Sequence, residues 1–342
     1  MSAQETLART FGEAISAGIA QEMERDASVV LFGEDVARYG GIYGHLQGLH
    51  ARFGDDRVRD TPISEAGFIG AAAGAATRGV RPIVELMTVD FYGVAMDQIT
   101  NYLAKLHYVS DGSRKAPMVI LASTGNPLRQ GVTHSQTLHG VFAHLPGLKV
   151  VLPSAAHETA GLLAAAIRDD DPVLFLFHRG LLGTRGNPWP DGEDGAADPP
   201  EVVPLGEAAV RRAGTDLTIA GVSFMVHQAM QAAAALSDEG IDAEVLDLRS
   251  LVPLDREALL RSVRKTGRLL VLDEDYRSFG MSAELMAIAV ERAWDALATP
   301  PRRLARADTP IPYSRVLEDA VMPAIPEIVE TARALVGRGE RS

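Results

Sequence analysis

The sequence predicts an α/β protein with two domains, each built on a doubly wound parallel sheet. Short apolar runs of strand length alternate with amphipathic stretches of helical spacing, which is typical of parallel sheets covered by helices. The length of 342 residues also fits two domains, at roughly 150 residues for each domain.

The first half of the chain holds the elements of one domain in a regular order. Apolar residues at Leu7, Phe11, Ile15 and Ile19 recur at helical spacing and predict the first helix. Strands are predicted at 29–32, 59–63, 81–87, 117–123, 149–152 and 173–177. Helices are predicted at 67–78, 90–108 and 156–167. These elements predict a first domain over residues 1–182.

A change in composition separates the two halves. Residues 183–204 are rich in proline, glycine and acidic residues, and this predicts a stiff polar linker. The alternating pattern then restarts, with strands predicted at 217–222, 243–248 and 268–272. Helices are predicted at 226–236, 256–265, 283–297 and, interrupted by Pro323 and Pro326, at 316–336. The second domain is therefore predicted over residues 205–342.

Composition and charge exclude several classes of protein. Lys and Arg total 33 against 45 Asp and Glu, a net charge of −12, which argues against binding to nucleic-acid phosphates or to an anionic membrane surface. The chain has no cysteine, so disulfides, thiolate metal ligands and cysteine nucleophiles are excluded. No apolar run approaches the length of a membrane span and no signal peptide is visible, so the expected location is cytoplasmic.

Two polar residues stand in loops that follow predicted strands, where α/β proteins bind their ligands. Glu65 precedes a predicted helix among apolar neighbours. It either stabilises the helix N-terminus or lies in an apolar pocket that raises its pKa. His134 lies in a glycine-containing loop after the strand that ends at Ser123, and it is either a surface residue or a functional one.

Two common kinds of ligand site are not indicated. The sequence contains neither a GxxxxGK[ST] phosphate loop nor a GxGxxG dinucleotide motif. His134, His139 and His144 follow one another at intervals of five, which does not match the helical i, i+4 pair of a zinc site. We therefore discount a nucleotide loop and a histidine zinc site.

Several longer motifs together carry a family resemblance over nearly the whole chain. They are LFGEDV at 31–36, DTPISE at 60–65, RPI at 81–83, HSQ at 134–136, PGLKVV at 146–151 and DLRSLVPLD at 247–255. With them the chain resembles the beta subunit of the thiamine-diphosphate-dependent 2-oxo acid dehydrogenases, the decarboxylating components of the pyruvate, branched-chain 2-oxo acid and acetoin dehydrogenase complexes. The resemblance implies a pyrimidine-binding domain followed by a transketolase-type C-terminal domain.

The resemblance also implies roles for individual residues. Glu65 matches the glutamate that hydrogen-bonds a ring nitrogen of the cofactor's aminopyrimidine and thereby favours its imino tautomer. Met87 and Phe91 match positions that pack on this ring, although ordinary core residues would show the same spacing. His134 matches a histidine near the reacting end of the cofactor, where it stabilises the intermediate or helps acyl transfer to lipoamide. Glu34 resembles an acidic residue that lies between paired active sites.

The same resemblance implies cofactors and partners. The expected cofactors are thiamine diphosphate and Mg²⁺, but the chain lacks the Gly-Asp-Gly segment and later Asn that hold the Mg²⁺-diphosphate group in thiamine enzymes. We therefore expect an alpha subunit, in an α2β2 heterotetramer, to supply those ligands. The acyl product is expected to pass to a lipoyl-bearing acyltransferase core.

Some members of this family hold a structural potassium ion, bound largely by backbone carbonyl groups. Oxygen ligands suit such a hard cation. The alternative is an ordinary solvated acidic turn over residues 169–172. The positions that align with the ion's ligands are Met118, Ala166, Ile167, Asp169 and Asp171.

The implied activity is oxidative decarboxylation of a 2-oxo acid, pyruvate or a branched-chain acid, with acyl transfer to lipoamide. Three alternatives stay open: an acetoin dehydrogenase beta subunit, a transketolase-like subunit that acts on sugar phosphates, and a non-catalytic assembly subunit. The chain departs from the family at Thr133, where glutamine is common, and at Phe177, where glutamate is common. These departures leave the substrate open.

Overall fold

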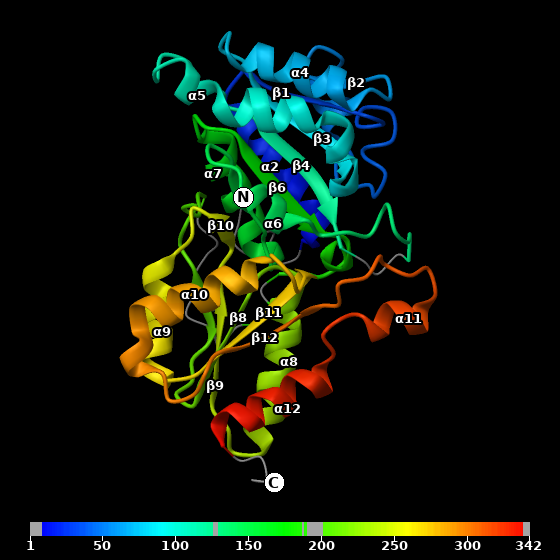
Figure 1. Cartoon of the computed structure of the whole chain (residues 1–342). Coiled ribbons are helices and arrows are strands. Elements are labelled where there is room, and N and C mark those ends of the chain that lie inside the picture. The colour runs from blue at the N-terminus through cyan, green and yellow to red at the C-terminus, as the bar shows by residue number, and fades with distance from the viewer. Residues whose placement is uncertain (1–8, 126–128, 187, 190–200, 338–342) are drawn as a thin grey trace. The chain divides into compact units, whose positions relative to one another are not determined.

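The computed structural model describes residues 9–125, 129–186, 188–189 and 201–337, and the chain divides into two compact units (Figure 1). The first unit consists of Met1–Leu128, Val141–Pro188 and Asp198–Leu205. The second consists of Arg129–Gly140, Trp189–Ala197 and Gly206–Ser342. The loop that carries His134 thus groups with the second unit. Each unit is an α/β fold, which confirms the predicted fold class.

The sheet of the first unit is parallel throughout. Its strands are β1 (Val29–Gly33), β2 (Val58–Asp60), β3 (Arg81–Thr88), β4 (Val119–Thr124), β5 (Lys149–Val151) and β6 (Val173–His178). They lie in the order β5-β6-β4-β3-β1-β2, with parallel pairing at each step. Every residue of β4 and β6 is buried, as expected for central strands covered on both faces.

Three of the predicted helices of this unit are present, as α2, α4 and α7, and further short helices accompany them. The helices are α2 (Phe11–Arg25), α3 (Leu49–Phe53), α4 (Glu65–Ala76) and α7 (Ala156–Arg168), with a 3₁₀ turn, η4 (Arg179–Leu181), after β6, while α6 (His139–Ala143) spans the sequence boundary between the units. A capping box formed by Thr10 and Glu13 starts α2, and Leu7 lies outside the described residues.

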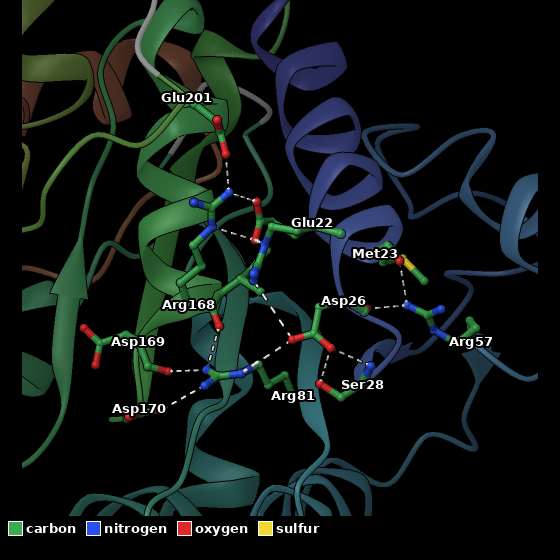
Figure 2. Close-up of polar contacts among 12 residues, drawn as sticks. Glu22, Met23, Asp26, Ser28, Arg57, Arg81, Arg168, Asp169, Asp170 and Glu201 are labelled. Atoms are coloured by element: carbon green, nitrogen blue, oxygen red, sulfur yellow. Dashed lines mark hydrogen bonds and ion pairs between the residues drawn. The ribbon is translucent and has the colours of Figure 1, made fainter.

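Helices α2 and α7 pack against each other around a buried carboxylate (Figure 2). Glu22 on α2 is fully buried and accepts hydrogen bonds from Arg168 on α7 at 2.7 and 2.9 Å and from Arg25 at 2.8 Å. Burial by itself would raise the pKa of Glu22, but these guanidinium groups outweigh it and lower that pKa. A buried charge of this kind is tolerated because it is paired.

The prediction of one long helix over 90–108 is wrong. The segment consists of η1 (Val89–Ala95) and η3 (Leu103–Lys105), both 3₁₀ helices, with the π-helix η2 (Gln98–Tyr102) between them and the short α5 (Leu106–Val109) at the end. Gly93 weakens a regular helix here. Thr100 Oγ1 also donates to the Met96 carbonyl at 2.6 Å, a bond that bends helices.

The sheet of the second unit has strands that the sequence does not reveal. Its strands lie in the order β12-β11-β8-β9-β7, and they are β7 (Ala209–Arg212), β8 (Leu217–Gly221), β9 (Ala243–Asp247), β11 (Leu269–Tyr276) and β12 (Arg302–Arg306). A short strand, β10 (Ser250–Val252), follows β9. Strand β7 pairs with β9 in antiparallel fashion, so this sheet is mixed rather than purely parallel. Edge strands β7 and β12 are short and arginine-rich, so they do not form the apolar runs by which the other strands were predicted.

The helices of the second unit cover the two faces of this sheet in pairs, α8 with α12 on one face and α9 with α10 on the other (Figure 1). They are α8 (Phe224–Asp238), α9 (Arg256–Thr266), α10 (Met281–Ala293) with the 3₁₀ turn η5 (Trp294–Ala296), α11 (Arg315–Ala320) and α12 (Ile325–Val336). The tail is interrupted near Pro323, as predicted. Within the described parts of the chain, no helix combines the length and apolarity needed to cross a bilayer.

The predicted linker falls largely on residues that are not described, because 187 and 190–200 lie outside the described residues. The domain boundaries at 182 and 205 therefore stay a prediction.

Candidate active site

Three carboxylates meet at the carboxyl edge of the first sheet. Glu34 follows β1 directly, Glu65 begins the helix after β2, and Glu85 lies in β3. In the parallel register, Gly33 of β1 pairs with Asp60 of β2 and with Glu85 of β3. Strand pairing thus brings together acidic residues that are far apart in the sequence, at the edge where α/β proteins bind ligands.

Gly33 allows the loop after β1 to pass close to β3. A Cβ atom at this position would lie 2.8 Å from the Glu85 carbonyl oxygen, 2.9 Å from the Glu85 Cβ and 2.7 Å from Val36 Cγ1. Any side chain would therefore push β1 and β3 apart. The glycine of the LFGEDV motif is what places Glu34 beside Glu85.

Burial and neighbouring negative charges raise the pKa of two members of this cluster, Glu34 and Glu85. Glu34 is 7%, Glu65 8% and Glu85 1% exposed. Burial raises the pKa of Glu34, and the charges of Glu65 and Asp35 raise it further. Burial also raises the pKa of Glu85 to about 8, where the backbone N–H of Met87 opposes the shift and the charges of Glu34 and Asp35 add to it. Raised carboxyl pKa values in a cluster are typical of sites that handle protons.

The carboxylate of Glu65 is not tied to the protein around it by a hydrogen bond from the described residues. Glu65 is the first residue of α4, where the helix dipole favours its charge. No hydrogen bond from the described residues reaches its carboxylate. Glu65 is 8% exposed, so its carboxylate can accept a hydrogen bond from a donor that enters from outside. An N–H group of a bound ligand is one such donor.

The end of β3 departs from regular strand geometry close to this cluster. Met87 has a φ angle of +63°, and the pairing of β3 with β4 shifts register between Glu85 and Thr88. The Met87 carbonyl accepts a hydrogen bond from Ser123 Oγ at 2.5 Å, which holds the bulge in place. Strain of this kind at a residue other than glycine is concentrated at functional sites.

Met87 and Phe91 are both half-buried. They lie on β3 and η1, and each of these elements packs against α4, which begins with Glu65. Their predicted contact with a cofactor ring stays a prediction.

His134 belongs to the second unit, so its distance from Glu65 also stays a prediction. Thr133 Oγ1 lies 2.8 Å from His134 Nδ1, so the residue that departs from the family pattern helps to orient the imidazole. The same loop is tied to β11 by Thr137 Oγ1, which donates to the Glu274 carbonyl at 3.0 Å. A second tie is the ion pair of His139 with Asp273, at 2.8 Å and fully buried.

This buried ion pair gives the His134 loop a pH-dependent stability. Burial by itself would lower the pKa of His139, but the charge and hydrogen bond of Asp273, with Asp275 and Glu274, raise it to about 9. The folded pKa exceeds the ordinary 6.5, so the ion pair contributes fully below about pH 6.5 and its contribution is lost as the pH rises through about 9.

We expect His139→Gln to destabilise the second unit by about 3–5 kcal/mol at neutral pH, because Asp273 is then a buried charge without its cation. The measurement is urea unfolding at a series of pH values from about 6 to 10. The cost of the substitution should shrink toward the alkaline end. His50→Gln, which removes a half-exposed partner of Asp55, is the control and should cost little. A cost for His139→Gln that is the same at every pH would contradict this account.

The turn predicted to hold potassium is already bound by cationic side chains, of which Figure 2 shows Arg81. Arg81 donates to the carbonyl oxygens of Ile167 at 3.1 Å and of Asp169 at 2.8 Å. Lys149 Nζ lies 2.6 Å from the Asp169 carboxylate and 3.3 Å from that of Asp171. The residues therefore fit a further cation poorly, and the potassium ion stays a prediction.

The described residues also contain no group of three or more His, Asp or Glu side chains placed to hold a metal ion. Two further residues that were predicted to bind potassium, Met118 and Ala166, have structural roles in the fold. The Met118 carbonyl accepts the Val173 N–H at 2.9 Å, and Ala166 is buried within α7.

The sequence did not identify two residues of this region, Glu85 and its neighbour His45. Glu85 carries a charge inside the otherwise apolar run of β3, and this was the signal that could have identified it. His45 lies in the glycine-rich loop after β1 with no periodic pattern around it, so only the fold reveals its place beside Glu85.

Comparisons with known proteins cover most of the chain. Residues 8–185 match the transketolase pyrimidine binding domain, and residues 206–328 match the transketolase C-terminal domain. A solved structure described as a split gene transketolase, inactive beta4 tetramer, has the same fold with a TM-score of 0.77, covering 96% of this chain and 99% of that chain at 22% identity.

Curated relatives span nearly the whole chain. The beta subunit of acetoin:2,6-dichlorophenolindophenol oxidoreductase from Cupriavidus necator is 43% identical over 337 residues, 96% of this chain and 97% of that protein. The corresponding subunit from Bacillus subtilis is 39% identical over 340 residues, 96% of this chain and 97% of that protein. The mitochondrial pyruvate dehydrogenase E1 component subunit beta-2 of Oryza sativa subsp. japonica is 44% identical over 324 residues, 95% of this chain and 85% of that protein. The chain therefore belongs to the family of transketolase-like beta subunits that includes those of the pyruvate dehydrogenase E1 component and of the acetoin oxidoreductases.

Proposed function

We propose that this chain is the beta subunit of a thiamine-diphosphate-dependent component that decarboxylates a 2-oxo acid and passes the acyl group to lipoamide. The observation that carries the proposal is Glu65, an 8% exposed residue whose carboxylate has no hydrogen-bond partner among the described residues and which lies in a cluster with Glu34 and Glu85. Thiamine diphosphate supplies, when bound, the nucleophilic carbon and the electron sink that this reaction needs.

Glu65 is the residue that would act on the cofactor directly. Its carboxylate holds a proton against a ring nitrogen of the aminopyrimidine, and this selects the tautomer in which the exocyclic nitrogen is basic. A charge-assisted hydrogen bond of this kind contributes roughly 1.5–3 kcal/mol. Met87 and Phe91 form the apolar wall that orients the ring. Glu34, whose pKa is raised by burial and by the Glu65 charge, takes the next position for proton transfer toward a paired site.

His134 is the second catalytic residue of the proposal. Its imidazole, oriented by Thr133, holds a proton near the reacting carbonyl group and supports acyl transfer to the lipoyl group. The loop around it is tied to β11 through Thr137 and His139, so the ring is presented from a fixed backbone.

The site needs a second chain. The sequence offers no diphosphate-binding segment, so an alpha subunit would hold the diphosphate group and Mg²⁺, in an α2β2 assembly that serves a lipoyl-bearing acyltransferase core. We also propose a cytoplasmic location, as the sequence predicts. An acetoin substrate is the second candidate, because beta subunits of acetoin oxidoreductases are as similar to this chain as those of pyruvate dehydrogenase.

The test is reconstitution with a cognate alpha subunit. We expect no turnover by the beta chain alone, and turnover of pyruvate, a branched-chain 2-oxo acid or acetoin once the alpha subunit, thiamine diphosphate and Mg²⁺ are present. Reduction of an artificial electron acceptor and acylation of a lipoyl domain are the two readouts.

Two results would contradict the proposal. Turnover of ketose phosphates in place of these substrates would favour a transketolase-like subunit. Assembly with the alpha subunit but no cofactor-dependent turnover of any of the substrates would favour a non-catalytic role.

A further inference from the structure

A buried imidazole lies beside the innermost carboxyl group of the cluster. His45 Nε2 is 3.5 Å from Glu85 Oε1, and both side chains are fully buried. Neither ring nitrogen of His45 and neither carboxyl oxygen of Glu85 makes a well-formed hydrogen bond in the described structure. Two such groups in an apolar interior are costly as separate charges, but they are tolerated when one donates a proton toward the other.

Packing holds the imidazole in this position. The rings of His45 and Phe177 have centroids 4.6 Å apart. Gly41, with a φ angle of +76°, leaves room for the ring, because a Cβ there would lie 2.8 Å from His45 Cε1. Phe177 is one of the two positions at which the chain departs from the family pattern. The departure therefore has a structural role, since an aromatic ring here supports the histidine.

The charges around the pair decide where the proton lies. Glu34 and Asp35, after β1, both raise the pKa of Glu85, and burial raises it further, to about 8. Glu65, on α4, acts on Glu34 in the same direction. Burial lowers the pKa of His45 to about 3. Arg179, after β6, donates to Thr88 Oγ1 at 2.9 Å. These shifts favour a protonated carboxyl group and a neutral imidazole at neutral pH.

We propose that Glu85 and His45 share one proton as a neutral acid–imidazole pair, and that this pair lowers the negative charge that Glu34 and Glu65 experience. The inference rests on the proposed function only where it concerns Glu65. Both residues are positioning residues, because they act through Glu34 and Glu65. The proton moves along the line between Glu85 Oε1 and His45 Nε2, and the step changes no covalent bond other than O–H and N–H.

The pair has a measurable effect on folding that needs no cofactor. The folded pKa of Glu85 is higher than its ordinary 4.5, so its protonated form stabilises the folded chain fully below about pH 4.5, and this contribution is lost as the pH rises toward 8. Glu85→Gln imitates the protonated carboxyl group at every pH. We expect its thermal midpoint to match the wild type near pH 5 and to exceed it increasingly up to about pH 8.

Glu22→Gln is the matched control, because Glu22 is equally buried but its pKa is lowered by Arg168 and Arg25. This variant should be less stable than the wild type by a nearly constant amount across the same pH range. A Glu85→Gln profile that runs parallel to the wild type would overturn the proposal.

Infrared spectroscopy tests whether His45 accepts the proton of the Glu85 carboxyl group. The wild type should show the C=O stretching band of a hydrogen-bonded carboxylic acid at neutral pH, and Glu85→Gln should lose it. His45→Leu keeps the packing against Phe177 but removes the acceptor, so the band should move to higher frequency. His45→Gln, which keeps an acceptor, should restore it in part. A band that is absent from the wild type, or that His45→Leu leaves in place, would overturn the pair.

The reconstituted assembly separates this inference from the proposed function. If Glu65 acts on the cofactor, the pH profile of kcat/KM should lose its alkaline limb near pH 8 in Glu85→Gln. If Glu85→Gln keeps the alkaline limb that the wild type shows in its pH profile of kcat/KM, the proposed influence of the pair on Glu65 is wrong. Stability and infrared results as expected, in an assembly without thiamine-dependent turnover, would confirm the pair and contradict the proposed function.

Discussion

Glu65→Gln should abolish cofactor activation while the fold stays intact. Glutamine cannot hold or release the proton that selects the basic tautomer, so we expect the rate of hydrogen–deuterium exchange at the reactive carbon of the cofactor to fall by about 10²–10⁴. Because Glu65 makes no hydrogen bond to the described residues, its replacement removes none from the fold. The loss at the helix N-terminus is about 0.3–1 kcal/mol.

The measurement is proton exchange in the reconstituted assembly, followed by NMR after acid quench. Glu257→Gln is a matched control, since Glu257 also lies in the first turn of a helix, α9, and has no place in the carboxylate cluster. This variant should exchange at the wild-type rate. Unchanged exchange in Glu65→Gln, with thiamine diphosphate bound, would show that the proposed role of Glu65 is wrong.

His134→Ala should have the second-largest effect, and it should fall on acyl transfer. An imidazole that holds a proton at the reacting group contributes about 10²–10⁴ to the rate. We therefore expect acylation of a lipoyl domain to fall by about that factor, with the affinity for thiamine diphosphate unchanged. His144→Ala, which removes an exposed histidine outside the loop, is the control and should have little effect.

Two assays on the same variant distinguish a role of His134 in decarboxylation from a role in acyl transfer. Reduction of an artificial acceptor reports decarboxylation without transfer, whereas lipoyl acylation requires both. Loss of acylation alone would assign His134 to transfer, and loss of both would assign it also to stabilisation of the decarboxylation step. Wild-type rates in both assays would contradict a catalytic role.

The carboxylate cluster illustrates what the motifs could and could not predict. The LFGEDV and DTPISE motifs identified Glu34 and Glu65, because both follow strands at the edge where α/β sheets bind ligands. Their proximity to Glu85 depends on the register that pairs Gly33 with both Asp60 and Glu85. The register is a property of the folded sheet, and the pattern of a single sequence does not reveal it.

The errors in the element prediction have a common physical cause. Apolar periodicity detects elements that bury one face, so it finds α2, α9 and the central strands well. Strand β7 has the sequence AVRR and therefore shows no apolar run. Its Arg211 can be buried because it pairs with Asp247 at 2.7 Å. The segment after β3 has helical spacing, but Gly93 and the hydroxyl of Thr100 interrupt the regular hydrogen bonding. In the first case a tertiary ion pair overrides the local pattern, and in the second a glycine and a local side-chain hydrogen bond do so.

The sequence by itself determined the fold class, the family and the two residues with the largest expected roles, because periodicity, strand-end position and long motifs are local properties of the chain. Only the tertiary structure decided which polar groups share an environment. Parallel pairing buried Glu85 beside Glu34, and packing against Phe177 placed His45 next to it. The pKa of a carboxyl group depends on burial and on neighbouring charges, and both arise only when distant segments come together.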